Sequence, residues 1–135
     1  MTIDYARRAR ALIGTRFRPQ GRWSELGVDC LGLLICVFGL SGQHIRRDYR
    51  LRGDHRRELL DGLQSYFRRV QRTAQRPGDV LLLRVAPDQF HIAVASAQGF
   101  VHADARLGMV VETAGPPRWP MIGVFRRRVR KPRHI

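Results

Sequence analysis

The chain has 135 residues, of which 44% are hydrophobic, and this length and composition are typical of one globular domain with its own core. No apolar run approaches the roughly 20 residues of a membrane-spanning helix, and the first residues lack the basic-then-apolar pattern of a signal peptide. The net charge of +14 comes almost entirely from arginine, because Lys131 is the only lysine. This surplus favours an anionic partner, such as nucleic acid, a membrane surface, a cell-wall polymer or an acidic protein, but it indicates neither a fold nor a reaction.

Three helices are predicted in the first half of the chain, over about residues 2–13, 30–40 and 54–71. Their apolar residues recur at helical spacing, and the second segment is apolar nearly all round. Thr2 can cap the first helix and Gly14 can end it, while Asp29 is the natural N-cap of the second. Residues 15–28 contain turn-forming glycines and a proline, and they are predicted to form a loop.

The pattern changes after the turn Arg76-Pro77-Gly78-Asp79. Five short segments rich in β-branched residues follow it, over residues 80–83, 90–95, 100–103, 109–112 and 122–125. Turn residues separate these segments, which predicts a meander of antiparallel strands. Helices followed by strands are typical of an α+β domain, with the helices on one side of a sheet of about five strands. We expect one domain over residues 1–135, with a basic tail from about residue 126.

Cys30 is the strongest candidate for a reactive residue. The segment Gly27-Val28-Asp29-Cys30-Leu31-Gly32 places its thiol directly after a turn, at the start of a predicted helix. Unpaired N–H groups and the helix dipole favour a negative sulfur there, and the thiolate is the reactive form. His91 and His102 lie in apolar segments far along the chain, and a cysteine with distant histidines is a candidate nucleophile–base pair. The alternative is that Cys30 is a small core residue.

The second cysteine, Cys36, is predicted to pack in the core. It follows Cys30 in the same helix, so their Cα atoms would lie about 9 Å apart, whereas a disulfide needs about 7 Å or less. A zinc site built from Cys30, His91 and His102 is disfavoured because a closely spaced ligand pair such as Cys-x-x-Cys is missing. We therefore expect no disulfide, no metal and no cofactor.

In their order, these motifs resemble the NlpC-type cell-wall peptidases, which are papain-like cysteine peptidases. The resemblance runs from Ala11 to about Phe125: Asp-Cys at a helix start, a Pro-Gly-Asp turn, a strand with His-Ile-Ala-Val, and then Phe-Val-His-Ala. Residues 14–17 and the segment Gln20-Gly21-Arg22 are similar to members encoded in bacteriophage and gene-transfer-agent tail modules. The resemblance implies a papain-like fold, with the cysteine at a helix N-terminus.

The resemblance also implies a reaction, the hydrolysis of an amide bond in peptidoglycan stem peptides, usually between γ-D-glutamate and diaminopimelate. Cys30 matches the nucleophile of this thiol protease, His91 the general base and His102 the residue that orients the base, which makes a Cys-His-His triad. His102 and Asp104 would point to the same face of a strand, so Asp104 is an alternative orienting group. The backbone N–H of Cys30 is a candidate oxyanion donor.

Two positions depart from the family pattern. Leu31 stands where many relatives have serine, and Phe17 where many have a tyrosine, whose hydroxyl can donate a hydrogen bond that phenylalanine cannot. Gln20 could supply the missing donor and contact the substrate. Asp29 matches a position that binds the substrate amine in relatives, although helix capping explains this residue equally well.

The resemblance further implies partners and a location. A tail-module member would be made in the bacterial cytoplasm, join tail-tip or hub proteins as a virion component, and act on peptidoglycan in the periplasm or cell wall. No nucleic-acid-binding motif is present, so no specific nucleic acid is expected as a partner. The alternative is an inactive structural subunit of the tail tip, which the departures at Leu31 and Phe17 would permit. Because all three catalytic positions are filled, an active enzyme is the favoured interpretation.

Overall fold

The computed structural model describes residues 3–19, 21–23, 27–40, 56–87 and 89–128. Its helical elements are α1 (Tyr5–Arg10), α2 (Cys30–Phe38), α3 (Arg56–Tyr66) and the short 3-10 turn η1 (Arg72–Ala74). Its strands are β1 (Arg22–Trp23), β2 (Gly27–Val28), β3 (Phe67–Val70), β4 (Val80–Ala86), β5 (Gln89–Ala95), β6 (Gly99–Asp104), β7 (Met109–Ala114) and β8 (Met121–Arg127). No helix in these ranges is long and apolar enough to cross a membrane.

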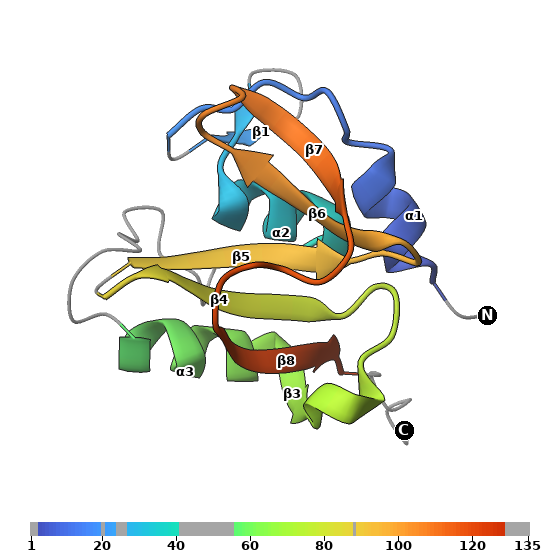
Figure 1. The fold of residues 1–135 in the computed structure, drawn as a ribbon, viewed down its shortest axis with the longest axis vertical. Helices are drawn as coiled ribbons and strands as arrows, with labels where there is room; N and C mark the ends of the chain where they lie inside the picture. The colour runs from blue at the N-terminus through green and yellow to red at the C-terminus, as the bar shows by residue number, and fades with distance from the viewer. Residues whose placement is uncertain (1–2, 20, 24–26, 41–55, 88, 129–135) are drawn as a thin grey trace, which may run out of the picture.

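Strands β3 to β8 form one sheet in the order β3-β8-β4-β5-β6-β7, and every neighbouring pair is antiparallel. Figure 1 shows α1 and α2 beside β5 and β6, and α3 toward the end of the sheet that holds β8 and β3. The predicted α+β class, with helices packed on an antiparallel sheet, is therefore confirmed. The sheet has six strands, whereas the sequence pattern predicted about five.

Residues in β4 alternate between the two faces of the sheet, as the strand period requires. Val80 and Leu82 join the main core, which also contains most of α2. Leu81 and Leu83 face the other side, where they form a smaller cluster with Phe100 and the partly buried Trp119. The buried residues of β4 thus contribute to two apolar layers. The smaller layer lies under the segment that joins β7 to β8.

Helix α2 follows its prediction closely. Asp29 is the N-cap, and its Oδ1 accepts a hydrogen bond from the Gly32 backbone N–H at 2.8 Å. Gly39 ends the helix in the left-handed conformation, with φ 63°, as glycine does at many helix C-termini. The sequence therefore places Cys30 correctly at the first residue of the helix.

The other two helices are shorter than predicted. In α1, the side chain of Asp4 accepts a hydrogen bond from the Arg7 N–H at 3.0 Å and caps the helix, whereas the proposed cap Thr2 lies outside the described residues. The prediction of a continuous third helix to residue 71 is wrong, because β3 begins at Phe67. Phe67 is fully buried and β3 pairs with β8, so tertiary pairing overrides a helical spacing that this segment also satisfies.

Two further segments differ from the sequence pattern. The predicted loop over residues 15–28 contains the short antiparallel pair β1–β2. Strand β8 continues through Arg126 and Arg127, which had been assigned to the basic tail, and residues 129–135 of that tail lie outside the described part of the chain. Arg126 forms an ion pair with the buried Asp79 at 2.9 Å, so at least this arginine has a structural partner.

Candidate active site

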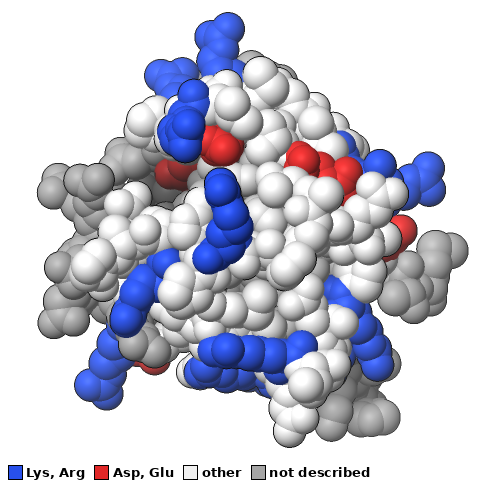
Figure 2. Space-filling model, viewed as in Figure 1, with Lys and Arg blue, Asp and Glu red and all other residues white. Residues whose placement is uncertain are grey.

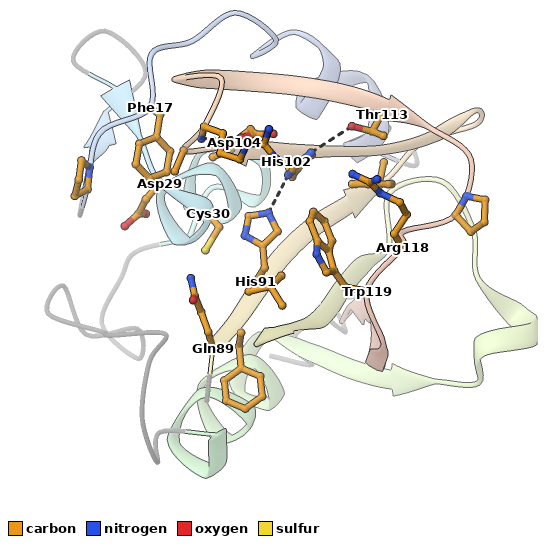
Figure 3. Close-up of a pocket in the computed structure, with 18 of the residues that line it drawn as sticks. Phe17, Asp29, Cys30, Gln89, His91, His102, Asp104, Thr113, Arg118 and Trp119 are labelled. Atoms are coloured by element: carbon orange, nitrogen blue, oxygen red, sulfur yellow. Dashed lines mark hydrogen bonds between the residues drawn. The ribbon is translucent and has the colours of Figure 1, made fainter. Parts of the chain in front are cut away.

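Cys30 lies at the start of α2, where the helix meets a cavity. The cysteine is buried, with 4% of its surface exposed, and it is among the residues that line the cavity. Its position in the first turn exposes the sulfur to the positive end of the helix dipole, which favours a thiolate. Figure 3 shows the sulfur directed toward the same space as the ring of His91.

A chain of hydrogen bonds leads away from this point across three neighbouring strands. His91 on β5 and His102 on β6 are joined through His91 Nε2 and His102 Nδ1 at 2.9 Å. His102 Nε2 then meets the hydroxyl of Thr113 on β7 at 3.3 Å. The side chains that sequence analysis placed in a triad, Cys30, His91 and His102, are thus brought to one site, and Thr113 extends the series (Figure 3).

This order of atoms fixes which nitrogen can act as a base. Because Nε2 of His91 is bonded to His102, Nδ1 is the nitrogen left to take a proton from a thiol. His91 must then carry its proton on Nε2 and donate it to Nδ1 of His102. His102 in turn carries a proton on Nε2 and donates it to the Thr113 oxygen. Thr113 therefore supplies the acceptor that favours, in both rings, the tautomer with its proton on Nε2.

Burial keeps both imidazoles neutral. The pKa of His91 is lowered from 6.5 to about 4: burial is the largest cause, the charge of nearby His102 acts in the same direction, and the Asp104 carboxylate opposes the shift. Burial also lowers the pKa of His102, again against the charge of Asp104. At neutral pH, the ring of His91 is therefore uncharged, and its Nδ1 is able to accept a proton.

The cavity has a volume of about 720 Å³ and opens to the surface. Trp119 covers the histidine pair from one side, with ring centroids 5.8 Å from His91 and 6.0 Å from His102, both edge to face. An aromatic cover of this kind excludes water and strengthens the hydrogen bond beneath it. Trp119 therefore both lines the cavity and packs on the two histidines.

The remaining predicted site residues have different positions. Asp29 caps α2 and also lines the cavity. Asp104 lines the cavity too, but its Oδ1 accepts hydrogen bonds from the backbone N–H groups of Arg106 and Leu107. The hydrogen-bond partner of His91 is His102. Gln20 lies outside the described residues.

The two departures from the family pattern are also placed. Phe17 lines the cavity and is held there by backbone hydrogen bonds between the segment that contains it and the start of β7. Leu31 is buried in the main core, with 1% of its surface exposed, so this side chain belongs to the packing of α2.

Sequence analysis missed four polar side chains that line the cavity, Gln89, Arg106, Thr113 and Arg118. Gln89 had a signal: it precedes His91 by two residues, and such residues share one face of a strand. Thr113 had none, because only the β6–β7 register brings it next to His102. No group of three or more His, Cys, Asp or Glu within the described ranges is arranged to hold a metal ion.

Comparison with known proteins supports the fold. No protein-family model and no curated protein matches the sequence. Among solved structures, the chain is similar to the NlpC/p60 domain of the peptidoglycan hydrolase SagA, with a TM-score of 0.59 and 20% identity, over 82% of this chain and 86% of that one. It is also similar to the peptidoglycan hydrolase RipB from Mycobacterium tuberculosis, with a TM-score of 0.58 and 21% identity, over 92% of this chain and 62% of that one. The fold is NlpC/p60-like.

The first prediction concerns Thr113. Thr113→Val removes the acceptor for the Nε2 proton of His102, so the tautomer in which His102 Nδ1 accepts from His91 loses its support. We expect alkylation of Cys30 by iodoacetamide at pH 7 to slow by about three- to tenfold, the value of one hydrogen bond. Mass spectrometry of the labelled peptides separates Cys30 from Cys36. Thr73→Val, the same change in the exposed turn η1, should leave the rate unaltered; equal rates in all three proteins would contradict this role.

The second prediction concerns pH. The Asp104 carboxylate raises the pKa of both histidines, so Asp104→Asn should lower both values while Oδ1 remains to accept from the backbone. His91 acts as a base only when its ring is uncharged. A lower pKa of His91 should therefore move the acid limb of kcat/KM for peptide hydrolysis to lower pH. Glu112→Gln is the control, since Glu112 pairs with Arg10 at 3.4 Å outside the cavity lining. A limb that stays in place, or moves to higher pH, in Asp104→Asn would argue against this electrostatic coupling.

Proposed function

We propose that the protein is a cysteine peptidase that hydrolyses amide bonds in peptidoglycan stem peptides. One observation carries the proposal: the 2.9 Å hydrogen bond between His91 Nε2 and His102 Nδ1, at a cavity that Cys30 also lines. A thiol at a helix start, a neutral imidazole and a third group that orients it are the parts that nucleophilic acyl transfer requires. The similar structures SagA and RipB are described as peptidoglycan hydrolases, which supports this choice of substrate.

The reaction follows from the order of the groups. His91 Nδ1 takes the proton of the Cys30 thiol, and the sulfur attacks the carbonyl carbon of the scissile amide to give a tetrahedral intermediate. The imidazolium of His91 then protonates the leaving nitrogen, the C–N bond breaks, and a thioester remains on Cys30. A water molecule, deprotonated by His91, attacks the thioester, which releases the acid and restores the thiol.

The oxyanion needs hydrogen-bond donors near the reacting carbon. The backbone N–H of Cys30 is one candidate, at the start of α2. Phe17 cannot donate, but the amide of Gln89 can, and Figure 3 draws Gln89 next to Cys30 and His91 at the cavity. We assign Gln89 the donor role for which sequence analysis considered Gln20.

Finer assignments rest on the sequence resemblance. We propose that the bond cut is the one between γ-D-glutamate and diaminopimelate, and that the protein acts in the periplasm or cell wall as part of a phage-like tail tip. The segment Gln20-Gly21-Arg22 before the cysteine supports the tail-module assignment.

The third prediction tests this location. Mass spectrometry of purified tail particles from the producing bacterium should detect the protein together with tail-tip or hub proteins. Extraction of particles with increasing salt should release it, because salt screens the attraction between a basic protein and an acidic docking surface. Particles that lack the protein altogether would rule out the tail-tip placement but not the hydrolase.

The fourth prediction tests the chemistry. Wild-type protein incubated with purified muropeptides should release fragments whose masses identify the bond, and Cys30→Ala should release none at an unchanged melting temperature. His91→Ala should be about as damaging, because members of a catalytic unit are strongly non-additive. His102→Ala should cost less, since a water molecule can partly replace an orienting group.

The inactive structural subunit remains the second candidate, favoured by Phe17 at the cavity in place of a hydrogen-bond donor. A wild-type protein that releases nothing from any peptidoglycan, and whose deletion nevertheless stops tail assembly, would establish that role and refute the hydrolase. Hydrolysis that survives in Cys30→Ala would refute the cysteine mechanism.

A further inference from the structure

We propose that Arg118 forms a subsite for a carboxylate of the substrate, at the end of the cavity opposite Asp29. The substrate class would then be a short peptide that carries a free carboxylate next to the scissile amide. The subsite deepens the proposed function and rests on it for the reaction, but the binding of the anionic group can be tested without hydrolysis.

The segment that carries Arg118 is rigid. Residues 115–120 read Gly-Pro-Pro-Arg-Trp-Pro and join β7 to β8, and each proline fixes its φ angle. At one end the Gly115 N–H donates to the Gln98 carbonyl at 2.8 Å, and at the other the Pro120 carbonyl accepts from the Arg84 N–H at 2.9 Å. Between them, Trp119 packs on the rings of His91 and His102. The backbone of Arg118 is therefore fixed relative to the base.

The guanidinium of Arg118 is available for a ligand. Its side chain is exposed at the cavity lining, and it has no hydrogen bond or ion pair with any residue that the structure describes. Two arginines on β8 are occupied: Arg126 pairs with Asp79, and Arg127 donates to the Tyr66 carbonyl. Recognition of a planar anion requires an unpaired guanidinium that is held in a fixed position. The rigid segment provides this for Arg118 beside the reactive centre.

The charges along the cavity give the substrate a direction. The charged side chains of the lining are Asp29, Asp104, Arg106 and Arg118. In Figure 3, Cys30, His91 and Trp119 lie between Asp29 and Arg118. A peptide that crosses the nucleophile therefore meets a carboxylate on one side and a guanidinium on the other. This arrangement suits a zwitterionic peptide with its amine toward Asp29 and a carboxylate toward Arg118, and it disfavours the reverse orientation.

The test uses binding to the full chain carrying Cys30→Ala, which cannot cleave its ligand. The probes are the stem tripeptide L-Ala-γ-D-Glu-diaminopimelate and the same peptide with its carboxylates converted to carboxamides, titrated by calorimetry. Cys30→Ala should bind the carboxylate form about fivefold or more tightly than the amide form, the range of a partly exposed charge pair. Adding Arg118→Gln should remove that difference by weakening only the carboxylate form.

Arg68→Gln is the matched control, because Arg68 is an exposed arginine on β3 and does not line the cavity. In the Cys30→Ala background it should leave both affinities unchanged. Unaltered discrimination after Arg118→Gln, equal loss in the Arg68 control, or no binding of either peptide would each overturn the subsite. If wild-type protein cleaves no stem peptide while discrimination still depends on Arg118, the subsite stands and the hydrolase proposal fails.

Discussion

The pairing of β5 with β6 is the constraint on which the site depends. The ladder sets Val94 opposite Val101 and Ala95 opposite Phe100. Continued in the same register, it places His102 opposite Ala93, and His91 lies one diagonal step further along the same face. That diagonal is short enough for two neutral imidazoles to form a hydrogen bond, and at this distance a positive charge on both rings is unfavourable. A slip of one residue would turn His102 to the other face and separate the two rings.

Local signals predicted much of the site. The Asp29 cap and the apolar residues that follow it defined α2, and the alternation of apolar residues defined β5 and β6, so Cys30, His91 and His102 could be named from sequence. Thr113 and Arg118 could not, since they reach the cavity through the register of β7 and through the path of the segment after it. β3 was missed because its residues suit a helix equally well, and only the edge of β8 selects the strand.

The arginine surplus has a partly structural explanation. Near the β3–β8 edge, guanidinium groups donate to backbone carbonyls: Arg69 to Ile122, Arg72 to Met121, Arg127 to Tyr66 and Arg128 to Gln64. Figure 2 shows basic side chains spread over the visible face rather than gathered in one patch. Part of the charge that favoured an anionic partner on composition alone therefore satisfies backbone carbonyl groups at the margin of the sheet.

The glycines around the nucleophile place three stretches of backbone directly against one another. A Cβ on Gly32 would lie 1.9 Å from the Gly21 oxygen, and one on Gly21 would lie 2.3 Å from the Gly27 oxygen. The first turn of α2 thus rests directly on main chain, where the Gly21 oxygen lies against Gly32. Variation in neighbouring side chains can then change the shape of the cavity without moving the sulfur, whereas a single methyl group at position 21 or 32 would force the layers apart. Substitutions in the residues that contact the substrate can therefore change the specificity while the nucleophile keeps its position.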